Sequence, residues 1–270
     1  MTRANAKRNR AAGRGSPATP VVPRQAAPVA EETKRELVFL VADKGMEAMI
    51  GAFFGRPDFH HKLRCAPFDF NPKTDIVRAG GHDPGLVKRE AGLILNRRRH
   101  EFRRAIVVVD HAYDNPLDPD RIRERISAQL DGTWEQFAVV VIEPELENWF
   151  WVDYPDLVKK VLLWTAKGGD RTPREVLAEA GLWQAGADKP LDPKKAVEYL
   201  YENGYSRDML NGIFKRLALA LPSVRGCTDE SFRLLMATLA EWFPATDGRA
   251  VTTHASTYAV DKTEQTEHTQ

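Results

Sequence analysis

The stretch Ala105-Ile106-Val107-Val108-Val109-Asp110 decides the fold class of this chain. It is apolar without interruption until it ends at a carboxylate, which is typical of a strand that is buried on both faces of a sheet. Two other stretches have the same character, residues 36–42 (Glu-Leu-Val-Phe-Leu-Val-Ala) and residues 137–142 (Phe-Ala-Val-Val-Val-Ile). Helix signals lie between all three. We therefore predict an α/β fold with a mainly parallel sheet flanked by helices.

Helix starts are marked by capping residues and prolines along the first half of the chain. A short glycine-containing loop leads into a predicted helix at residues 46–50. Asp83-Pro84 reads as an N-cap followed by proline at the first helical position, and this helix is expected to run to about Arg98. Residues 119–130 form the next predicted helix, and Pro144 is expected to open another. A weak strand is predicted at residues 63–70.

The second half of the chain is predicted to be helical. Its apolar periodicity and proline-marked starts indicate helices at residues 156–164, 173–180, 193–203, 206–220 and 231–243. We expect an α/β domain over residues 35–154 and a helical C-terminal subdomain over residues 155–244. Residues 1–34 and 245–270 lack apolar periodicity, so both are expected to be disordered tails.

Composition points to a soluble cytoplasmic protein. The chain has 270 residues, of which 43% are hydrophobic, enough for one sizeable core. No apolar run approaches the roughly 18–20 residues of a membrane-spanning helix, and the charged N-terminus is not followed by the apolar segment of a secretory signal. The two cysteines, Cys65 and Cys227, are far apart and are expected to be free thiols in a reducing compartment.

The formal net charge of +1 conceals a basic arm on an acidic body. Residues 1–30 contain six of the 39 basic residues and no acidic one, so the rest of the chain has 33 basic against 38 acidic residues and a net charge of −5. Such an arm attracts nucleic acid, but it could equally be a solvated tail. The basic run Arg97, Arg98 and Arg99 has the same two interpretations: a patch that receives phosphates beside the acidic edge, or a solvated helix end.

Carboxylates follow the carboxyl ends of all three predicted strands. They are Asp43 and Glu47 after the first, Asp110 and Asp114 after the second, and Glu143, Glu145 and Glu147 after the third. Parallel strands bring these ends to one edge, so we expect Glu47, Asp110 and Asp114 to converge there, with Glu145 or Glu147 nearby. Gathered carboxylates repel one another unless a hard cation such as Mg²⁺ lies among them. The alternative is that they only cap helices.

Several segments of the chain carry a resemblance to known proteins. The apolar strand ending in Asp110, followed by Pro144-Glu145-Leu146-Glu147-Asn148-Trp149, resembles TOPRIM-like proteins of prokaryotic defence islands. More closely, the chain resembles one small bacterial family that includes an accessory component of the methylation-associated antiphage defence system. The segments that carry this closer resemblance are His82-Asp83-Pro84-Gly85, Ile106–Asp110, Ile142–Trp151 and Arg225-Gly226-Cys227-Thr228-Asp229. The resemblance covers roughly residues 36–244.

The resemblance implies a TOPRIM-like domain at residues 35–154 with an Mg²⁺ centre. Such a centre has a glutamate after its first strand and an Asp-x-Asp after a later one. Here Ala42 or Asp43 stands at the glutamate position, and Ala112 stands at the position of the second aspartate. We predict Asp110 and Glu47 as catalytic residues. The candidate Mg²⁺ ligands are Asp110, Glu47, Asp114, Asp43, Glu145 and Glu147.

The resemblance also implies a biological setting. We expect a component of a multi-gene bacterial antiviral defence system that acts with the other proteins of that system. Its ligand would carry phosphate, as nucleic acid or nucleotide, and Mg²⁺-dependent nuclease-like activity is one reading. The degenerate motif leaves a second reading open, in which the protein is a catalytically silent adaptor or regulatory subunit.

Overall fold

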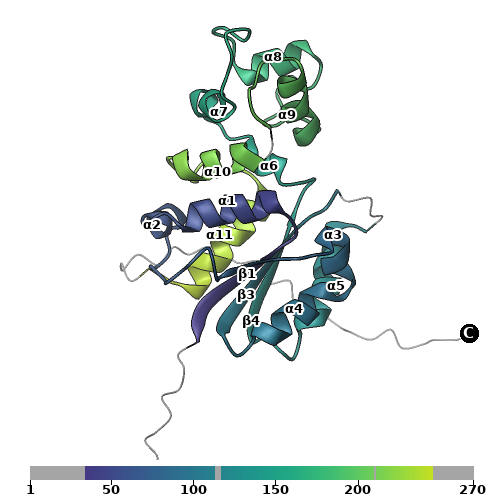
Figure 1. The fold of residues 1–270 in the computed structure, drawn as a ribbon, viewed down its shortest axis with the longest axis vertical. Helices are drawn as coiled ribbons and strands as arrows, with labels where there is room; N and C mark the ends of the chain where they lie inside the picture. Colours follow the sequence, from purple (N-terminus) through teal and green to yellow (C-terminus); the bar gives the residue numbers. More distant parts are fainter. Residues whose placement is uncertain (1–33, 113–116, 210, 246–270) are drawn as a thin grey trace, which may run out of the picture. The chain divides into compact units, whose positions relative to one another are not determined.

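The computed structural model describes residues 34–112, 117–209 and 211–245. These residues contain a four-stranded, all-parallel sheet in the order β2-β1-β3-β4 (Figure 1). Its strands are β1 (Arg35–Val41), β2 (Ile76–Arg78), β3 (Phe102–Asp110) and β4 (Gln136–Ile142). The three strands predicted from apolar runs are therefore confirmed as neighbours in one parallel sheet.

The register of the sheet brings its carboxyl ends together. Phe39 of β1 is paired with Ile76 of β2 and with Ile106 of β3, and Asp110 of β3 is paired with Ile142 of β4. The central residues of β1, β3 and β4 are buried, as expected for strands covered on both faces. The residues that follow Val41, Asp110 and Ile142 consequently lie along the same edge.

Helices cover both faces of the sheet (Figure 1). On one face lie α1 (Lys44–Phe54) and α11 (Glu230–Trp242), with α10 (Asn211–Ala220) packed against α1. On the other face lie a short α3 (His82–Gly85), a π-helical turn (Leu86–Glu90), α4 (Ala91–Arg98) and α5 (Pro119–Leu130). The π-helical turn joins α3 to α4 without a break, so the predicted helix ending at Arg98 is confirmed at its C-terminal end.

The remaining helices confirm a helical C-terminal portion. They are α7 (Pro155–Val161), α8 (Pro173–Glu179) and α9 (Pro193–Glu202), which lie in this portion together with α10 and α11. Two further short helices, α2 (Phe59–Leu63) and α6 (Glu147–Phe150), precede it. Capping residues account for several of these starts. Thr172 and Glu175 form a capping box at α8, and Asp192 accepts the backbone N–H of Lys195 at α9.

Three local predictions are wrong. The weak strand at residues 63–70 is absent, apart from an isolated bridge between Cys65 and Pro244, and β2 lies further along the chain. Asp83 is inside α3, and its side chain does not cap the helix. Pro144 does not open a helix, because α6 begins three residues later at Glu147.

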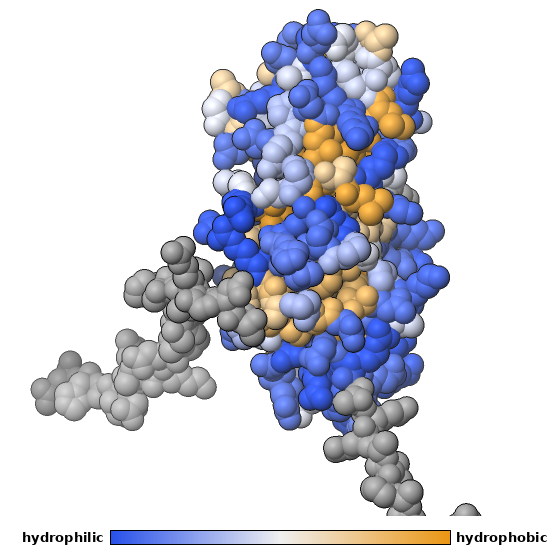
Figure 2. All heavy atoms as spheres, turned by 90° about the vertical axis from the view of Figure 1, so that its left-hand side faces the viewer, coloured by the Kyte–Doolittle hydropathy of each residue, from blue (hydrophilic) through white to orange (hydrophobic). Residues whose placement is uncertain are grey.

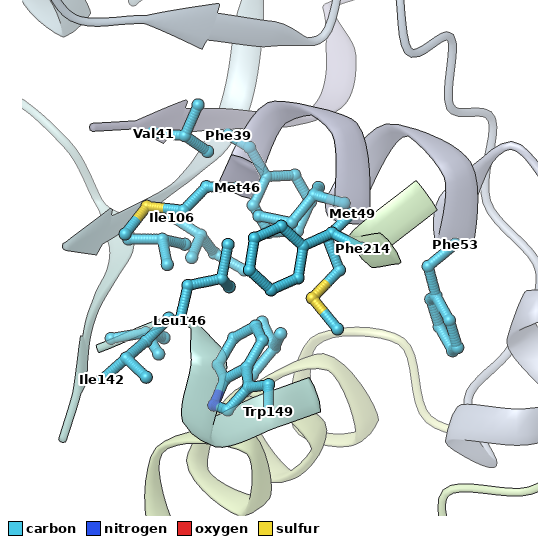
Figure 3. Close-up of a cluster of buried hydrophobic side chains, with 14 of the residues drawn as sticks. Phe39, Val41, Met46, Met49, Phe53, Ile106, Ile142, Leu146, Trp149 and Phe214 are labelled. Carbon is cyan, nitrogen blue, oxygen red and sulfur yellow. The ribbon is translucent and has the colours of Figure 1, made fainter. Parts of the chain in front are cut away.

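The core joins the sheet to the helices on the α1 face. Figure 3 shows side chains from β1, β3, α1, α6 and α10 meeting in one buried cluster. Its labelled members are Phe39, Val41, Met46, Met49, Phe53, Ile106, Ile142, Leu146, Trp149 and Phe214. Leu146 and Trp149 belong to the acidic segment after β4, so core packing fixes the position of the glutamates between and beside them.

Two sequence-level expectations concern the compartment. Cys65 and Cys227 are free thiols, as predicted, although Cys227 is only half-buried. Across the described ranges no helix has the length and apolar character needed to cross a bilayer.

Candidate functional site

The strand order places two aspartates where an open α/β sheet binds its ligands. The chain moves from β1 to β2 on one side and then to β3 on the other, so the order reverses between β1 and β3. Asp43 follows β1, and Asp110 is the last residue of β3. A crevice outside the carboxyl ends at such a reversal is the common ligand position in this architecture.

Asp110 is the most perturbed carboxylate of this edge. Its backbone N–H donates a hydrogen bond to Asp83 Oδ1 at 2.8 Å. Its own Oδ1 atom is buried and has no hydrogen-bond partner within the described part of the chain. Burial raises the pKa of Asp110 well above its usual range, and the charges of Asp83, Asp43, Glu147 and Glu145 raise it further.

Asp83 is a member of this cluster that sequence reasoning missed. It was interpreted as a helix cap, but its side chain is 8% exposed and faces Asp110 rather than the turn of α3. Burial raises the pKa of Asp83, and the charge of Asp43 adds to the effect. Asp83 reaches the edge because the carboxyl end of β2 leads into the Gly80-Gly81 turn just before it, and a strand of three residues leaves no periodic signal in the sequence.

Glu147 joins the cluster from the first turn of α6. Its side chain is 6% exposed, and burial raises its pKa from 4.5 to about 7, with further contributions from the charges of Glu145 and Asp43. Close packing brings this segment to the start of α1. A Cβ atom on Gly45 would lie 3.0 Å from a methyl carbon of Leu146, so a larger residue there would push against Leu146.

Backbone hydrogen bonds tie the loops after β3 and β4 to each other. The N–H of His111 donates to the carbonyl of Ile142 at 2.9 Å, and the N–H of Ala112 donates to the carbonyl of Pro144 at 2.8 Å. Asp43 is held separately, because its carboxylate accepts the N–H of Met46 at 2.8 Å and caps α1. Asp43 therefore caps a helix and also belongs to the carboxylate cluster, two roles that the sequence left as alternatives.

Lys194 supplies the one positive charge that acts strongly on several of these acids in the described residues. It lies in the first turn of α9, and its Nζ is 3.8 Å from Oε2 of Glu145. Burial opposes its charged form, but the charges of Glu145, Glu147, Glu198 and Asp110 outweigh burial and raise its pKa. The cluster of Asp43, Asp83, Asp110, Glu145, Glu147 and Lys194 is called the acidic edge below.

Other predicted site residues lie elsewhere or outside the described residues. Glu47 is exposed and forms an ion pair with Arg78 at 2.9 Å, and it is not among the main charges acting on Asp110. Asp114 belongs to residues 113–116, outside the described residues. Arg97–Arg99 precede the start of β3, while Asp110 ends it. The arginine run therefore lies at the amino end of β3. At about 3.3 Å per residue, this end is roughly 26 Å from Asp110 at the carboxyl end.

The acidic edge does not form a closed protein cage for a metal. Among the residues that the structure describes, no group of three His, Cys, Asp or Glu side chains is arranged to hold one ion. The donors present are carboxylate oxygens, which suit hard cations. An ion at this edge would take one or two protein ligands and complete its shell with water or ligand oxygens.

Comparison with known proteins identifies no relative: no family model, curated protein or solved structure matches this chain.

Proposed function

We propose that the acidic edge binds a divalent cation, Mg²⁺, and through it a phosphate-bearing ligand, either nucleic acid or nucleotide. The observation that carries the proposal is the buried Oδ1 atom of Asp110. It lacks a hydrogen-bond partner in the described structure and lies among four other carboxylates. A buried polar atom without a partner is costly, and so is a cluster of like charges. A cation beside Asp110 would relieve both.

The donor set fits Mg²⁺ better than a metal that needs many protein ligands. Mg²⁺ usually retains several waters and binds through one or two carboxylates plus the phosphate oxygens of a substrate. Asp110 would be the principal ligand, and Glu147 or Asp83 would assist from the same edge. Bound there, the ion would polarise phosphate oxygens. Lys194, at the rim beside Glu145, would contact the phosphate charge directly.

The biological setting proposed for this site follows the motif resemblance. We propose a component of a multi-gene bacterial antiviral defence system that works in the cytoplasm with the other proteins of the system. A specific observation favours a second candidate, the catalytically silent adaptor. Glu47, the residue proposed as catalytic partner of Asp110, is paired with Arg78, and Ala112 lacks a carboxylate. In the adaptor, the edge would bind its ligand without turning it over.

Calorimetric titration with Mg²⁺ tests the site. Asp110→Asn should weaken binding by at least about ten-fold, because an amide oxygen carries no charge to attract the ion. Affinity for the wild-type protein should rise as pH increases through about 7, because Mg²⁺ must displace the proton held by Glu147.

The matched control for this titration is Asp118→Asn. Asp118 is an exposed cap of α5 after the same strand, and asparagine caps as well as aspartate does. This variant should bind Mg²⁺ like the wild type. Equal binding by Asp110→Asn and wild type, or no binding by the wild type, would refute the cation site.

Plaque counts in a host that carries the complete defence locus test the setting. Deletion of the gene should weaken phage resistance. If the cation site is essential, Asp110→Ala should weaken resistance as much as deletion does, with circular dichroism showing that the variant is folded. An adaptor predicts that Asp110→Ala stays protective while deletion does not. Normal resistance in the deletion strain would contradict a defence role against the phages tested.

A further inference from the structure

A cavity of about 500 Å³ lies between α1, α11 and the segments around α6, α7 and α8. Its walls are mainly aromatic and aliphatic, with Trp149, Trp151, Trp183, Phe53 and Leu235 among them, and no residue of the acidic edge lines it. Figure 2 shows hydrophobic side chains gathered between hydrophilic ones on one face of the molecule. The volume is that of a site for a small organic ligand.

The three tryptophans present ring surface rather than hydrogen-bond donors to this cavity. Each indole N–H already donates a hydrogen bond within the protein, at 2.8–3.1 Å. Trp149 donates to the carboxylate of Asp229 and to Ser231 Oγ. Trp151 donates to the Pro193 carbonyl, and Trp183 donates to the Ala187 carbonyl. The rings of Trp151 and Trp183 meet edge to face with centroids 5.3 Å apart. A ligand body that enters the cavity therefore meets apolar and π surface, which suits a flat aromatic group.

The charged side chains that line the cavity differ in whether they already have partners within the protein. Lys189 is engaged by Asp229 at 3.1 Å and by the carbonyl of Asn148 at 2.8 Å. Arg174 donates to a backbone carbonyl and lies over the ring of Trp183, but it has no carboxylate partner among the described residues, so its charge offsets one of the two aspartates of the lining. By contrast, Asp153 and Asp188 are exposed lining residues, and neither has a hydrogen bond or ion pair within the described residues.

We propose that this cavity binds an organic cation with a flat aromatic body. The aromatic body would lie against the indole rings, and the positive group would be attracted by Asp153 and Asp188 at the exposed side. Cations also interact favourably with the faces of tryptophan rings. Arg174 already lies over the ring of Trp183, so this contribution comes from Trp149 and Trp151. This second site is independent of the cation proposed at the acidic edge.

Three probes with the same aromatic body and different charge test the proposal by calorimetry or NMR titration. They are 1-naphthylmethylammonium, 1-naphthylmethanol and 1-naphthoate. We expect saturable binding of the ammonium probe, about ten-fold tighter than the alcohol and tighter still than the carboxylate. If the ammonium probe shows no saturable binding to the wild-type protein, the proposal is wrong.

Two glycine substitutions locate the binding. Gly226 is an exposed residue of the cavity lining, and a Cβ atom on it would meet nothing within 4 Å, so Gly226→Phe introduces an aromatic ring at the cavity mouth with no clash at Cβ. Gly80 is equally open but lies outside the cavity, so Gly80→Phe is the matched control. We expect Gly226→Phe to abolish binding of the ammonium probe and Gly80→Phe to retain it. Retained binding in both would place the ligand elsewhere and overturn the proposal.

The rim carboxylates are tested without altering the cavity walls. In the double variant Asp153→Asn and Asp188→Asn, the preference for the ammonium probe over the alcohol should fall to about two-fold or less. Both positions are exposed, so this variant should fold even if Gly226→Phe does not. An unchanged preference would show that the rim does not select a cation.

Discussion

Glu147→Gln should make the folded protein more stable than the wild type by about 3 kcal/mol near pH 8, and close to the wild type near pH 4. Burial raises the pKa of Glu147 from 4.5 to about 7, and the charges of Glu145 and Asp43 add to this. The folded state therefore holds the proton more tightly than the unfolded state does. The stability that this proton provides is fully present below about pH 4.5 and is lost as pH rises through about 7. Glutamine keeps the shape of the side chain and removes the charge.

Urea unfolding between about pH 4 and pH 8.5, with a chelator present, measures this difference. The chelator is needed because a cation at the acidic edge would stabilise the ionised form and reduce the effect. Glu143→Gln is the matched control, since it removes an exposed carboxylate from the same segment and leaves the buried one in place. A Glu147→Gln variant whose stability parallels the wild type at every pH would mean that Glu147 ionises without cost.

The burial of the sheet on both faces explains why its strands could be predicted from sequence. Strands of a parallel sheet covered on both faces must be apolar throughout, and residues 105–110 and 137–142 show this directly. Helix starts were found at Asp118-Pro119 and Asp192-Pro193, where a cap and a proline coincide, although the same pair at Asp83-Pro84 lies inside α3. In each case the residues that determine the structure are local, so a single sequence contains the signal.

The acidic edge was predicted only in part, because its composition depends on long-range contacts. Asp110, Asp43, Glu145 and Glu147 were placed correctly at one edge by the rule that parallel strands end together. Asp83 was missed because β2 is three residues long, too short to give a periodic signal. The engagement of Glu47 by Arg78 could not be foreseen, since Arg78 belongs to that same unpredicted strand.

The cavity was beyond prediction for a related reason. The indole N–H groups of Trp149, Trp151 and Trp183 are engaged by the protein itself, at acceptors far away in the sequence for Trp149 and Trp151. The sequence does not show that the tryptophan rings leave an empty space between themselves and α1. That space arises from the arrangement of helices from both halves of the chain.

Asp229→Ala should destabilise the protein by about 3–5 kcal/mol, because the carboxylate serves several partners at once. It caps α11 by accepting the N–H of Phe232, accepts the indole N–H of Trp149 at 3.0 Å, and forms an ion pair with Lys189 at 3.1 Å. Its side chain is only 4% exposed. Alanine would remove the ion-pair partner of a largely buried ammonium group and one of the two acceptors of the Trp149 indole N–H.

Asp192→Ala separates this effect from the loss of a helix cap. Asp192 caps α9 but is exposed and has no ion pair among the described residues, so its replacement should cost only about 1 kcal/mol. Urea unfolding near neutral pH compares the two variants, and Asp229→Asn, which keeps the shape of the cap, should fall between them. Equal losses for Asp229→Ala and Asp192→Ala would contradict the proposed network. Because Asp229 accepts hydrogen bonds from Asn148 and Trp149, which follow Glu147 in α6, a large loss would show that this network stabilises the attachment of α6 to α11.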